Sequence, residues 1–352
     1  MSSVSSVLNL VWLLVQRPHL IYIFSILNII KFISRLLIVS LPAIILLVWV
    51  EFGLRNIDSV YKLKPKLLES QADKIEVLIL GSSNAYFDYD PKYFSCPGFN
   101  FAINAQSPYY DYKITEKYIK DLPNLKLVVL PAIFYTLGTN LTQTSNSWRT
   151  FFYSNYMNIP IEKTGLGFFD GLRRTIDPKN FSKIALFGDN TYGYAREKFT
   201  GQVDIFIPEK NGWYDSAPIP NLDPNKSGGK DAAFAHSVSV EDHFFDLNLF
   251  YWQSLIELLK KKGIAVAIIR APEDYSYFSN LDPAKVNLMN LKIRDLASKN
   301  HIQFLDYSDS KKFNAYDFTV LPDHMNPAGS KKFSEMINQD LIQKYCSIPS
   351  AR

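Results

Sequence analysis

The chain of 352 residues is long enough for one large domain with an anchor, or for two modest domains. Apolar residues make up 47% of the composition, which supports a sizeable buried core and excludes a disordered protein. The 38 basic and 34 acidic residues leave a formal net charge of +4 without a long run of one sign, so no nucleic-acid partner is expected. The two cysteines, Cys96 and Cys346, lack zinc-site spacing and allow one disulfide bond.

The N-terminal region contains a membrane-spanning pattern. Residues 32–54 are largely apolar, and their only charged residues are Arg35 near the start and Glu51 near the end. About 20 such residues, rising about 1.5 Å each, cross a hydrocarbon core of about 30 Å. Pro42 is expected to kink the helix, which membrane helices tolerate. Because no small-residue cleavage site follows, the pattern predicts a retained transmembrane anchor in the lipid bilayer rather than a cleaved signal peptide.

The orientation of this anchor is not decided by its flanking charges. Basic residues lie on both sides of residues 32–54, so the positive-inside rule gives no clear answer. Residues 4–30 are also apolar but are interrupted at 16–19, so they either lie in the membrane interface or form a second span. We expect a single-pass protein of the cell membrane whose soluble domain is extracytoplasmic (periplasmic). A hairpin of two spans would reverse this orientation.

The remainder of the chain divides by composition. Residues 1–55 form the anchor region, residues 56–74 are expected to be a polar linker, and residues 75–345 are expected to form one domain. Within that domain, the sequence between about 137 and 239 loses its regular pattern and becomes rich in aromatic residues, glycine and proline. A stretch of roughly 100 residues is too long for a simple loop, so we interpret it as an insertion with structure or function of its own.

Short apolar runs alternate with helical patterns in the domain. Five runs are predicted to be buried strands, at residues 75–80, 99–104, 125–130, 264–272 and 302–308. Helical patterns follow at 107–120, 240–262, 283–300 and from 327 to about 345. This alternation predicts a doubly wound parallel α/β sheet, with functional groups at the carboxyl ends of the strands.

A serine and a histidine lie at such positions. Gly81 allows a tight turn after the first predicted strand, where the hydroxyl of Ser83 can stand above the sheet. A serine nucleophile needs a base with a pKa near neutrality, for which histidine is suited. Of the five histidines, His324 alone follows the last predicted strand. His19 lies in the membrane region, and His301 lies at the opposite end of a predicted strand. His236 and His243 flank the insertion.

Three blocks of sequence resemble those of the SGNH (GDSL-type) hydrolase superfamily. They are ILGSSNAYFDYDPKYF with Ser82 in the place of the usual aspartate, FNFAINAQSPYYDY, and DHMNPAGSKKFSEMI. The chain is most similar to the membrane-anchored members that act in polysaccharide acylation, such as the D-alanyl transfer protein of teichoic acids and the alginate O-acetylation proteins. The resemblance implies a flavodoxin-like three-layer α/β/α fold, with Ser83 as nucleophile and His324 as general base. It implies no metal and no organic cofactor.

The resemblance also suggests the other site residues. Ala105 stands where the second block has glycine, and its N–H, with those near Ser83, would line an oxyanion hole. Asn140 is the candidate for the asparagine of the third block. Asp323 is the candidate acidic partner of the histidine, although the family places the acidic residue three positions before the histidine, where Leu321 stands. Because neighbouring side chains of an extended chain point apart, a dyad without Asp323 is an alternative.

These features predict a serine-dependent O-acyltransferase or esterase. Its substrates would be O-acyl groups of an envelope polysaccharide, or an acyl donor, and a membrane-bound O-acyltransferase is an expected partner. The departures at Ala105 and Leu321 suggest an alternative, in which the domain is a catalytically silent binding or assembly component of an envelope polysaccharide machine. An esterase for soluble substrates is a third option, which the retained anchor disfavours.

Overall fold

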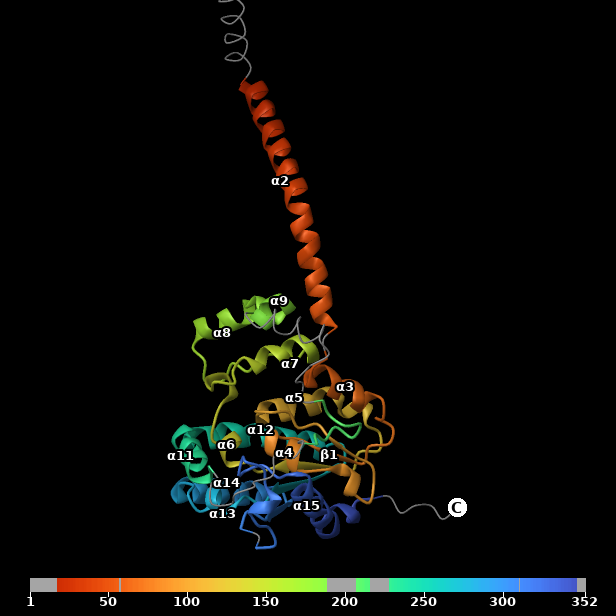
Figure 1. Ribbon diagram of the computed structural model, residues 1–352, viewed down its shortest axis with the longest axis vertical. Coiled ribbons are helices and arrows are strands. Elements are labelled where there is room, and N and C mark those ends of the chain that lie inside the picture. The colour runs from red at the N-terminus through yellow and green to blue at the C-terminus, as the bar shows by residue number, and fades with distance from the viewer. Residues whose placement is uncertain (1–17, 57, 189–206, 216–227, 310, 347–352) are drawn as a thin grey trace, which may run out of the picture. The chain divides into compact units, whose positions relative to one another are not determined.

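The structure is a computed structural model that describes residues 18–56, 58–188, 207–215, 228–309 and 311–346 (Figure 1). The chain separates into two compact units. The first contains Met1–Ile57 and Ser182–Ala195, and the second contains Asp58–Phe181 and Arg196–Arg352.

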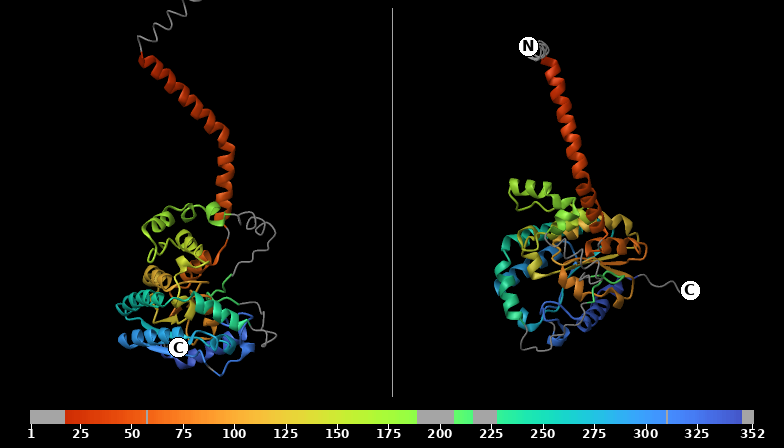
Figure 2. Two further views of the ribbon diagram at one scale, coloured as in Figure 1. Left: turned by 90° about the vertical axis from the view of Figure 1, so that its left-hand side faces the viewer. Right: turned by 45° about the horizontal axis from the view of Figure 1, so that its top comes forward.

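The first unit contains the long apolar helix α2 (Pro18–Arg55). Within Ile26–Arg55, an 18-residue stretch has a mean hydropathy of 2.4 and is not buried, so this segment is long and apolar enough to cross a membrane. Figure 2 shows α2 bent partway along its length, and Pro42, which was expected to kink it, lies in its interior. Residues 18–30 continue the same helix rather than forming a separate span. The part of the apolar stretch before residue 18 lies outside the described residues.

A short helix from the insertion is attached to the end of α2. Helix α9 (Lys183–Phe187) begins where the carboxylate of Glu51 accepts the backbone N–H of Lys183 at 2.9 Å and that of Ile184 at 3.1 Å. The carboxylate thus satisfies N–H groups that lack partners in the first turn of a helix. Glu51, which marked the end of the apolar run in the sequence, therefore joins two segments of this unit that are far apart in the chain.

The second unit is built on a five-stranded parallel sheet with strand order β2-β1-β3-β4-β5. The strands are β1 (Val77–Ile79), β2 (Gly98–Asn100), β3 (Leu127–Pro131), β4 (Ala265–Arg270) and β5 (Gln303–Asp306). Each overlaps one of the five predicted runs. Every residue of β1 and β3 is buried, as expected for central strands covered on both faces. The α/β class with a five-stranded parallel sheet is therefore confirmed.

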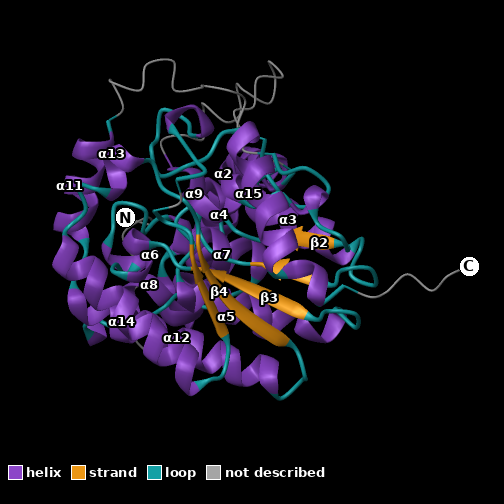
Figure 3. Ribbon diagram, turned by 90° about the horizontal axis from the view of Figure 1, so that it is seen from below, coloured by secondary structure: helices purple, strands orange, loops and turns teal. Residues whose placement is uncertain are grey.

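Helices cover both faces of this sheet (Figure 3). On one face, alternate strand residues such as Val77 and Val129 pack with Tyr86 of α4 and Phe333 of α15. The other alternate residues point to the opposite face, where α12 packs beside α5 and α14. The α-helices of this unit are α3 (Val60–Glu69), α4 (Ser83–Asp88), α5 (Pro108–Tyr118), α6 (Phe134–Leu137), α7 (Arg149–Met157), α8 (Phe168–Ile176), α11 (Gly229–Ser239), α12 (Asp242–Lys260), α13 (Tyr275–Phe278), α14 (Pro283–Lys299) and α15 (Pro327–Asp340). Short 3-10 turns lie at η1 (Pro91–Tyr93), η2 (Ile119–Asp121), η3 (Leu141–Gln143), η4 (Pro178–Asn180), η7 (Ala315–Asp317) and η8 (Ile342–Lys344).

Residues 56–74 were expected to be a polar linker, but they contain helix α3, which belongs to the second unit. The linker prediction is therefore corrected. Lys64 of this helix is completely buried. Its ammonium nitrogen donates to the carbonyl of Asn100 at 3.0 Å and lies 3.6 Å from the centre of the Tyr86 ring. Burial lowers the pKa of Lys64 well below its ordinary value. A lysine that sequence alone assigns to a solvated linker is thus part of the packing next to β2.

The described parts of the insertion at 137–239 are largely helical, and except for α9 they belong to the second unit. Helix α11, which forms the last part of the insertion, contacts α13 and α6. In the segment at 207–215, Trp213 is buried, and its indole N–H donates to the carbonyl of Phe87 at 2.7 Å. The insertion therefore contributes to the surroundings of α4, the helix that begins at Ser83.

The two cysteines form a disulfide bond. Cys96, just before β2, is joined to Cys346, just after η8, and their Cα atoms are 5.3 Å apart. The bond closes a loop of 250 residues that contains most of the second unit.

Candidate functional site

Ser83 is the first residue of α4 and follows β1 by a sharp turn. Gly81 adopts a φ of +104°, which side-chain-bearing residues rarely adopt, and an added Cβ would lie 3.2 Å from the ring of Pro131. Of the two serines in the turn, Ser82 is buried and its hydroxyl accepts a hydrogen bond from Thr136 Oγ1 at 3.0 Å. Ser83 is half-buried. Of the two serines in the turn, Ser83 is therefore the more accessible.

Asp323 and His324 form a bonded pair. The carboxylate Oδ1 of Asp323 lies 2.8 Å from Nδ1 of His324, and both side chains are nearly buried. The chain turns here, with the N–H of His324 donating to the carbonyl of Leu321 at 3.0 Å. Because this segment is a turn and not extended chain, the two neighbouring side chains converge. The acidic partner predicted at Asp323 thus contacts the histidine, although the family spacing would have placed it at Leu321.

The segment carrying Ser83 and the segment carrying His324 are in contact. The side-chain amide of Asn84 donates to the carbonyl of Asp323. The ring of Phe87 meets the imidazole of His324 edge-on, with 5.2 Å between ring centres. Within the described part of the chain, however, no hydrogen bond joins Ser83 Oγ to His324. Catalytic hydrogen bonds are often long without substrate, and the contacts place both residues at one edge of the sheet.

The backbone beside His324 is held by a further carboxyl group. Oδ1 of Asp88, the last residue of α4, accepts the N–H of Met325 at 2.8 Å. Asp88 is buried, and burial raises its pKa well above the ordinary value. This hydrogen bond connects the helix that begins at Ser83 with the residue that follows the histidine.

Asp323 and His324 each favour the charged form of the other. Burial acts to raise the pKa of Asp323, but the charge and the hydrogen bond of His324 outweigh it and lower this pKa to about 2. Burial acts to lower the pKa of His324, but the charge and the hydrogen bond of Asp323 raise it above the ordinary value. Near neutral pH the carboxylate is ionised, orients the imidazole through Nδ1 and favours its protonated form. These are the properties required of the acidic member of a catalytic triad.

Ala105 lies in the turn after β2 with a φ of +59°. This is the left-handed region that favours glycine, which accounts for the glycine that the resemblance expects at this position. Ala105 is half-buried. Its role as an oxyanion donor remains a prediction.

Asp111 of α5 connects this turn with the turn at Ser83, and the sequence did not suggest it. One of its oxygens, Oδ1, accepts the N–H of Gly81 at 2.9 Å and the side-chain amide of Gln106 at 2.7 Å. The other, Oδ2, accepts the indole N–H of Trp252 at 3.3 Å. Burial raises the pKa of Asp111 to about 6. The only sequence signal was an acidic residue inside the second resembling block, in the first turn of a predicted helix.

Asn140 has a different environment from the one expected of an oxyanion donor. Its side-chain oxygen accepts hydrogen bonds from the backbone and the hydroxyl of Thr142, at 2.9 and 2.7 Å. Its amide nitrogen donates to the carbonyl of Thr164 at 3.2 Å. Among the described residues, these hydrogen bonds hold Asn140 in the local structure of the insertion and do not bring it to Ser83.

A second histidine lies in the electrostatic surroundings of the pair. His236 of α11 interacts electrostatically with both Asp323 and His324. Its Nδ1 lies 2.7 Å from the hydroxyl of Tyr277, and its ring packs against that of Tyr135 with 4.5 Å between centres. In the sequence His236 only flanked the insertion, and no spacing rule linked it to a residue almost 90 positions later.

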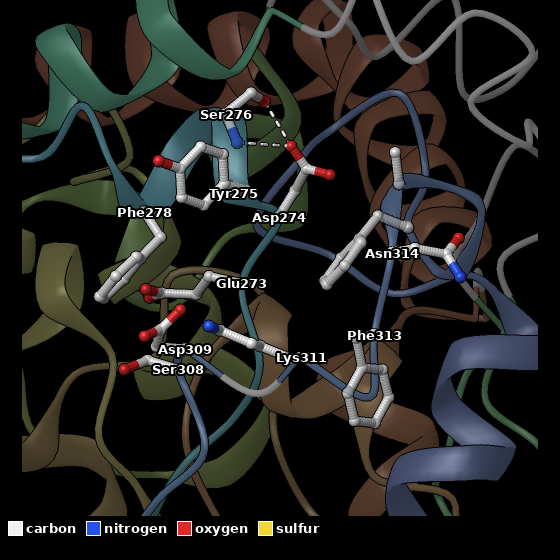
Figure 4. Close-up of a pocket in the computed structure, with 12 residues that line it drawn as sticks. Glu273, Asp274, Tyr275, Ser276, Phe278, Ser308, Asp309, Lys311, Phe313 and Asn314 are labelled. Carbon is white, nitrogen blue, oxygen red and sulfur yellow. Dashed lines mark hydrogen bonds between the residues drawn. The ribbon is translucent and has the colours of Figure 1, made fainter.

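A cavity of about 450 Å³ opens at the carboxyl ends of β4 and β5. Figure 4 shows charged side chains beside aromatic rings in this cavity, and its lining includes Glu273, Asp274, Tyr275, Asp309, Lys311 and Phe313. Neither Ser83 nor His324 lines it. The N–H of Asp274 donates to the carbonyl of Pro322 at 2.9 Å, so the wall of the cavity is bonded to the segment of the Asp323–His324 pair.

No protein-family model and no curated protein matches the sequence.

Proposed function

We propose that this chain is a membrane-anchored, SGNH-like serine O-acyltransferase or esterase that acts on O-acyl groups of an extracytoplasmic polysaccharide. One observation carries the proposal. The half-buried Ser83 at the turn after β1 and the bonded Asp323–His324 pair after β5 lie on segments that contact each other at the carboxyl edge of the sheet.

In the proposed reaction, Ser83, His324 and Asp323 act as the nucleophile, the base and the acidic member of a catalytic triad. Ser83 Oγ attacks the acyl carbonyl carbon while its proton passes to Nε2 of His324, the nitrogen that Asp323 leaves available. The carbonyl electron pair moves to the oxygen, and N–H groups near Ser83 and Ala105 stabilise the oxyanion. Collapse releases the alcohol, which takes the proton from His324, and leaves an acyl-enzyme. An acceptor hydroxyl, or water in an esterase, then repeats the sequence in reverse.

The topology supports the SGNH-like assignment. The strand order β2-β1-β3-β4-β5 corresponds to the flavodoxin-like order 2-1-3-4-5. Together with the helices on both faces of the sheet (Figure 3), this order supports the three-layer arrangement that the sequence resemblance implies. Sites in such sheets form where the strand order reverses, next to the first strand. Ser83 lies directly after that strand.

The disulfide supports an extracytoplasmic location for the second unit. Disulfide bonds persist in oxidising compartments and are rare where thiols are kept reduced. Cys96 and Cys346 are the only cysteines of the chain, and they are paired with each other. Together with the apolar helix α2, this favours a single-pass protein of the cell membrane whose catalytic unit is on the periplasmic side.

The cavity beside the pair is our candidate for the glycan-binding site. Carboxylates and a lysine can form hydrogen bonds with sugar hydroxyls, while aromatic rings such as Tyr275, which is 75% exposed, offer flat apolar surfaces. In this proposal a membrane-bound O-acyltransferase is the partner that delivers the acyl group at the membrane. The polysaccharide, held in the cavity, then receives it from Ser83.

Labelling by a fluorophosphonate probe tests the proposal. The full-length chain in detergent micelles should be labelled at Ser83 and should hydrolyse p-nitrophenyl acetate, because both reactions need an activated serine. Ser83→Ala should abolish labelling and lower turnover by roughly 10³-fold or more. Ser82→Ala is the matched control, because it removes the neighbouring, buried hydroxyl, and it should still be labelled. Wild-type turnover in Ser83→Ala would refute the proposal.

A non-catalytic role in envelope polysaccharide assembly is the second candidate. The observation that favours it is that, among the described residues, Ser83 and His324 share no hydrogen bond. A wild-type chain that binds acylated polysaccharide but neither reacts with fluorophosphonate nor hydrolyses esters would support this alternative.

A further inference from the structure

His236 lies next to the elements that carry the proposed reaction. It projects from α11, and its ring packs on Tyr135, with 4.5 Å between ring centres and 33° between ring planes. Tyr135 is followed in the chain by Thr136, whose hydroxyl donates to Ser82 Oγ at 3.0 Å. His236 thus lies against α6, which is hydrogen-bonded to the turn before Ser83, and against α13, whose preceding residue Asp274 is bonded to Pro322 beside the Asp323–His324 pair.

Tyr277 determines which nitrogen of His236 carries a proton. Tyr277 is 2% exposed, and within the described residues its hydroxyl has one hydrogen-bonding partner, Nδ1 of His236 at 2.7 Å. A buried hydroxyl that does not donate loses a hydrogen bond without compensation. The hydroxyl therefore donates and Nδ1 accepts, which leaves the N–H of a neutral imidazole on Nε2.

The neutral form is favoured near neutral pH. Burial lowers the pKa of His236, and the nearby charge of His324 acts in the same direction, against the charge of Asp323. Burial also keeps the pKa of Tyr277 well above its ordinary value, so the tyrosine retains its proton. The side chain is consequently a fixed N–H donor rather than a second base.

The proposed oxyanion hole calls for a side-chain donor. The resemblance assigned a donor to Asn140, in addition to the backbone N–H groups near Ser83 and Ala105. The amide nitrogen of Asn140 is directed at the carbonyl of Thr164 instead. His236 approaches the end of β3 through Tyr135, in the region where the predicted third block lies.

We infer that His236 donates a hydrogen bond from Nε2–H to the carbonyl oxygen of the acyl group during reaction at Ser83, in the role expected of Asn140. The inference rests on the proposed function and adds a side-chain donor to it. As Ser83 Oγ bonds to the carbonyl carbon, the electron pair of the carbonyl π bond moves to the oxygen, and the serine proton moves to His324. His236 keeps its proton throughout and stabilises the oxyanion until the carbonyl re-forms.

The test compares two substitutions of His236 in the full-length chain, with p-nitrophenyl acetate as the acyl donor. His236→Leu removes the donor, and a single oxyanion donor typically changes kcat by about 10²- to 10³-fold. We expect a fall in kcat of that size with KM changed by less than about threefold, because the interaction forms mainly in the transition state. His236→Gln retains an N–H donor, so its kcat should be at least tenfold higher than that of His236→Leu. His243→Leu is the control, since His243 is an exposed histidine at the start of α12, and it should leave kcat unchanged.

A second variant keeps the inference testable if His236→Leu does not fold. Tyr277→Phe removes the hydroxyl that fixes the tautomer but retains the ring, and it should lower kcat by roughly tenfold. If kcat stays within twofold of wild type in His236→Leu, or in Tyr277→Phe when the leucine variant is unfolded, the inference is wrong. In that case Ser83→Ala would still be inactive, so the proposed function would stand. Turnover that survives Ser83→Ala would instead overturn the proposed function together with this inference.

Discussion

Replacing Asp323 with asparagine should move the pH dependence of catalysis in a defined direction. In the folded protein the pKa of Asp323 falls from 3.8 to about 2, although burial alone would raise it. At 1.36 kcal/mol per pKa unit, this difference of about 1.8 corresponds to about 2 kcal/mol in favour of the ionised carboxylate. The interaction between Asp323 and His324 is mutual, so it also favours the protonated imidazole.

The sign of the expected change follows from the role of His324. As general base the imidazole must be neutral, so kcat/KM rises as pH increases through its pKa. In the wild type this pKa lies above 6.5, because Asp323 outweighs the effect of burial. In Asp323→Asn burial remains and the negative charge is lost. The rising limb of the plot of kcat/KM against pH should therefore move to lower pH. The value of kcat/KM at the high-pH plateau should fall by roughly 10²- to 10⁴-fold, because the carboxylate no longer orients the imidazole.

The assay is hydrolysis of p-nitrophenyl acetate between pH 4 and 9 by the full-length chain. Asp295→Asn is a matched control, because Asp295 is an exposed carboxylate on α14 that pairs with Lys299. Its profile should coincide with that of the wild type. A limb that stays in place or moves to higher pH in Asp323→Asn would show that this carboxylate does not set the pKa of the base.

Two further predictions concern stability. Asp111 has a pKa of about 6 in the folded protein and an ordinary value of 3.8, so the unfolding free energy should decrease by about 3 kcal/mol as pH rises from about 3 to about 7. Asp111→Asn should flatten this part of a plot of Tm against pH. An unchanged slope in the variant would contradict the assignment. Cys96→Ser with Cys346→Ser opens a loop of 250 residues, for which chain entropy gives up to about 5 kcal/mol, so Tm should fall by roughly 10 °C or more. A reducing agent should lower the wild-type Tm to the same value, and equal Tm values in all three samples would argue against the disulfide.

The sequence by itself determined the features that depend on local patterns. Continuous apolar runs identify strands buried on both faces, because in a parallel sheet every side chain of a central strand meets a helix layer. The five predicted runs therefore coincide with β1 to β5. The same reasoning applies to α2, since an apolar stretch of sufficient length is a local property. The positions of Ser83 and His324 after the first and last strands follow from strand order alone.

Tertiary structure decided everything that depends on which distant groups meet. A turn brings Asp323 to His324, while Asn140 bonds within the insertion. Asp111 and His236 became relevant only when folding placed them beside Gly81 and the Asp323–His324 pair. Hydrophobic periodicity reports burial of a segment against an unspecified neighbour, but hydrogen bonds and ion pairs are directional and act over a few ångströms. Their partners, such as His236 and Tyr277, are specified only by the packed chain.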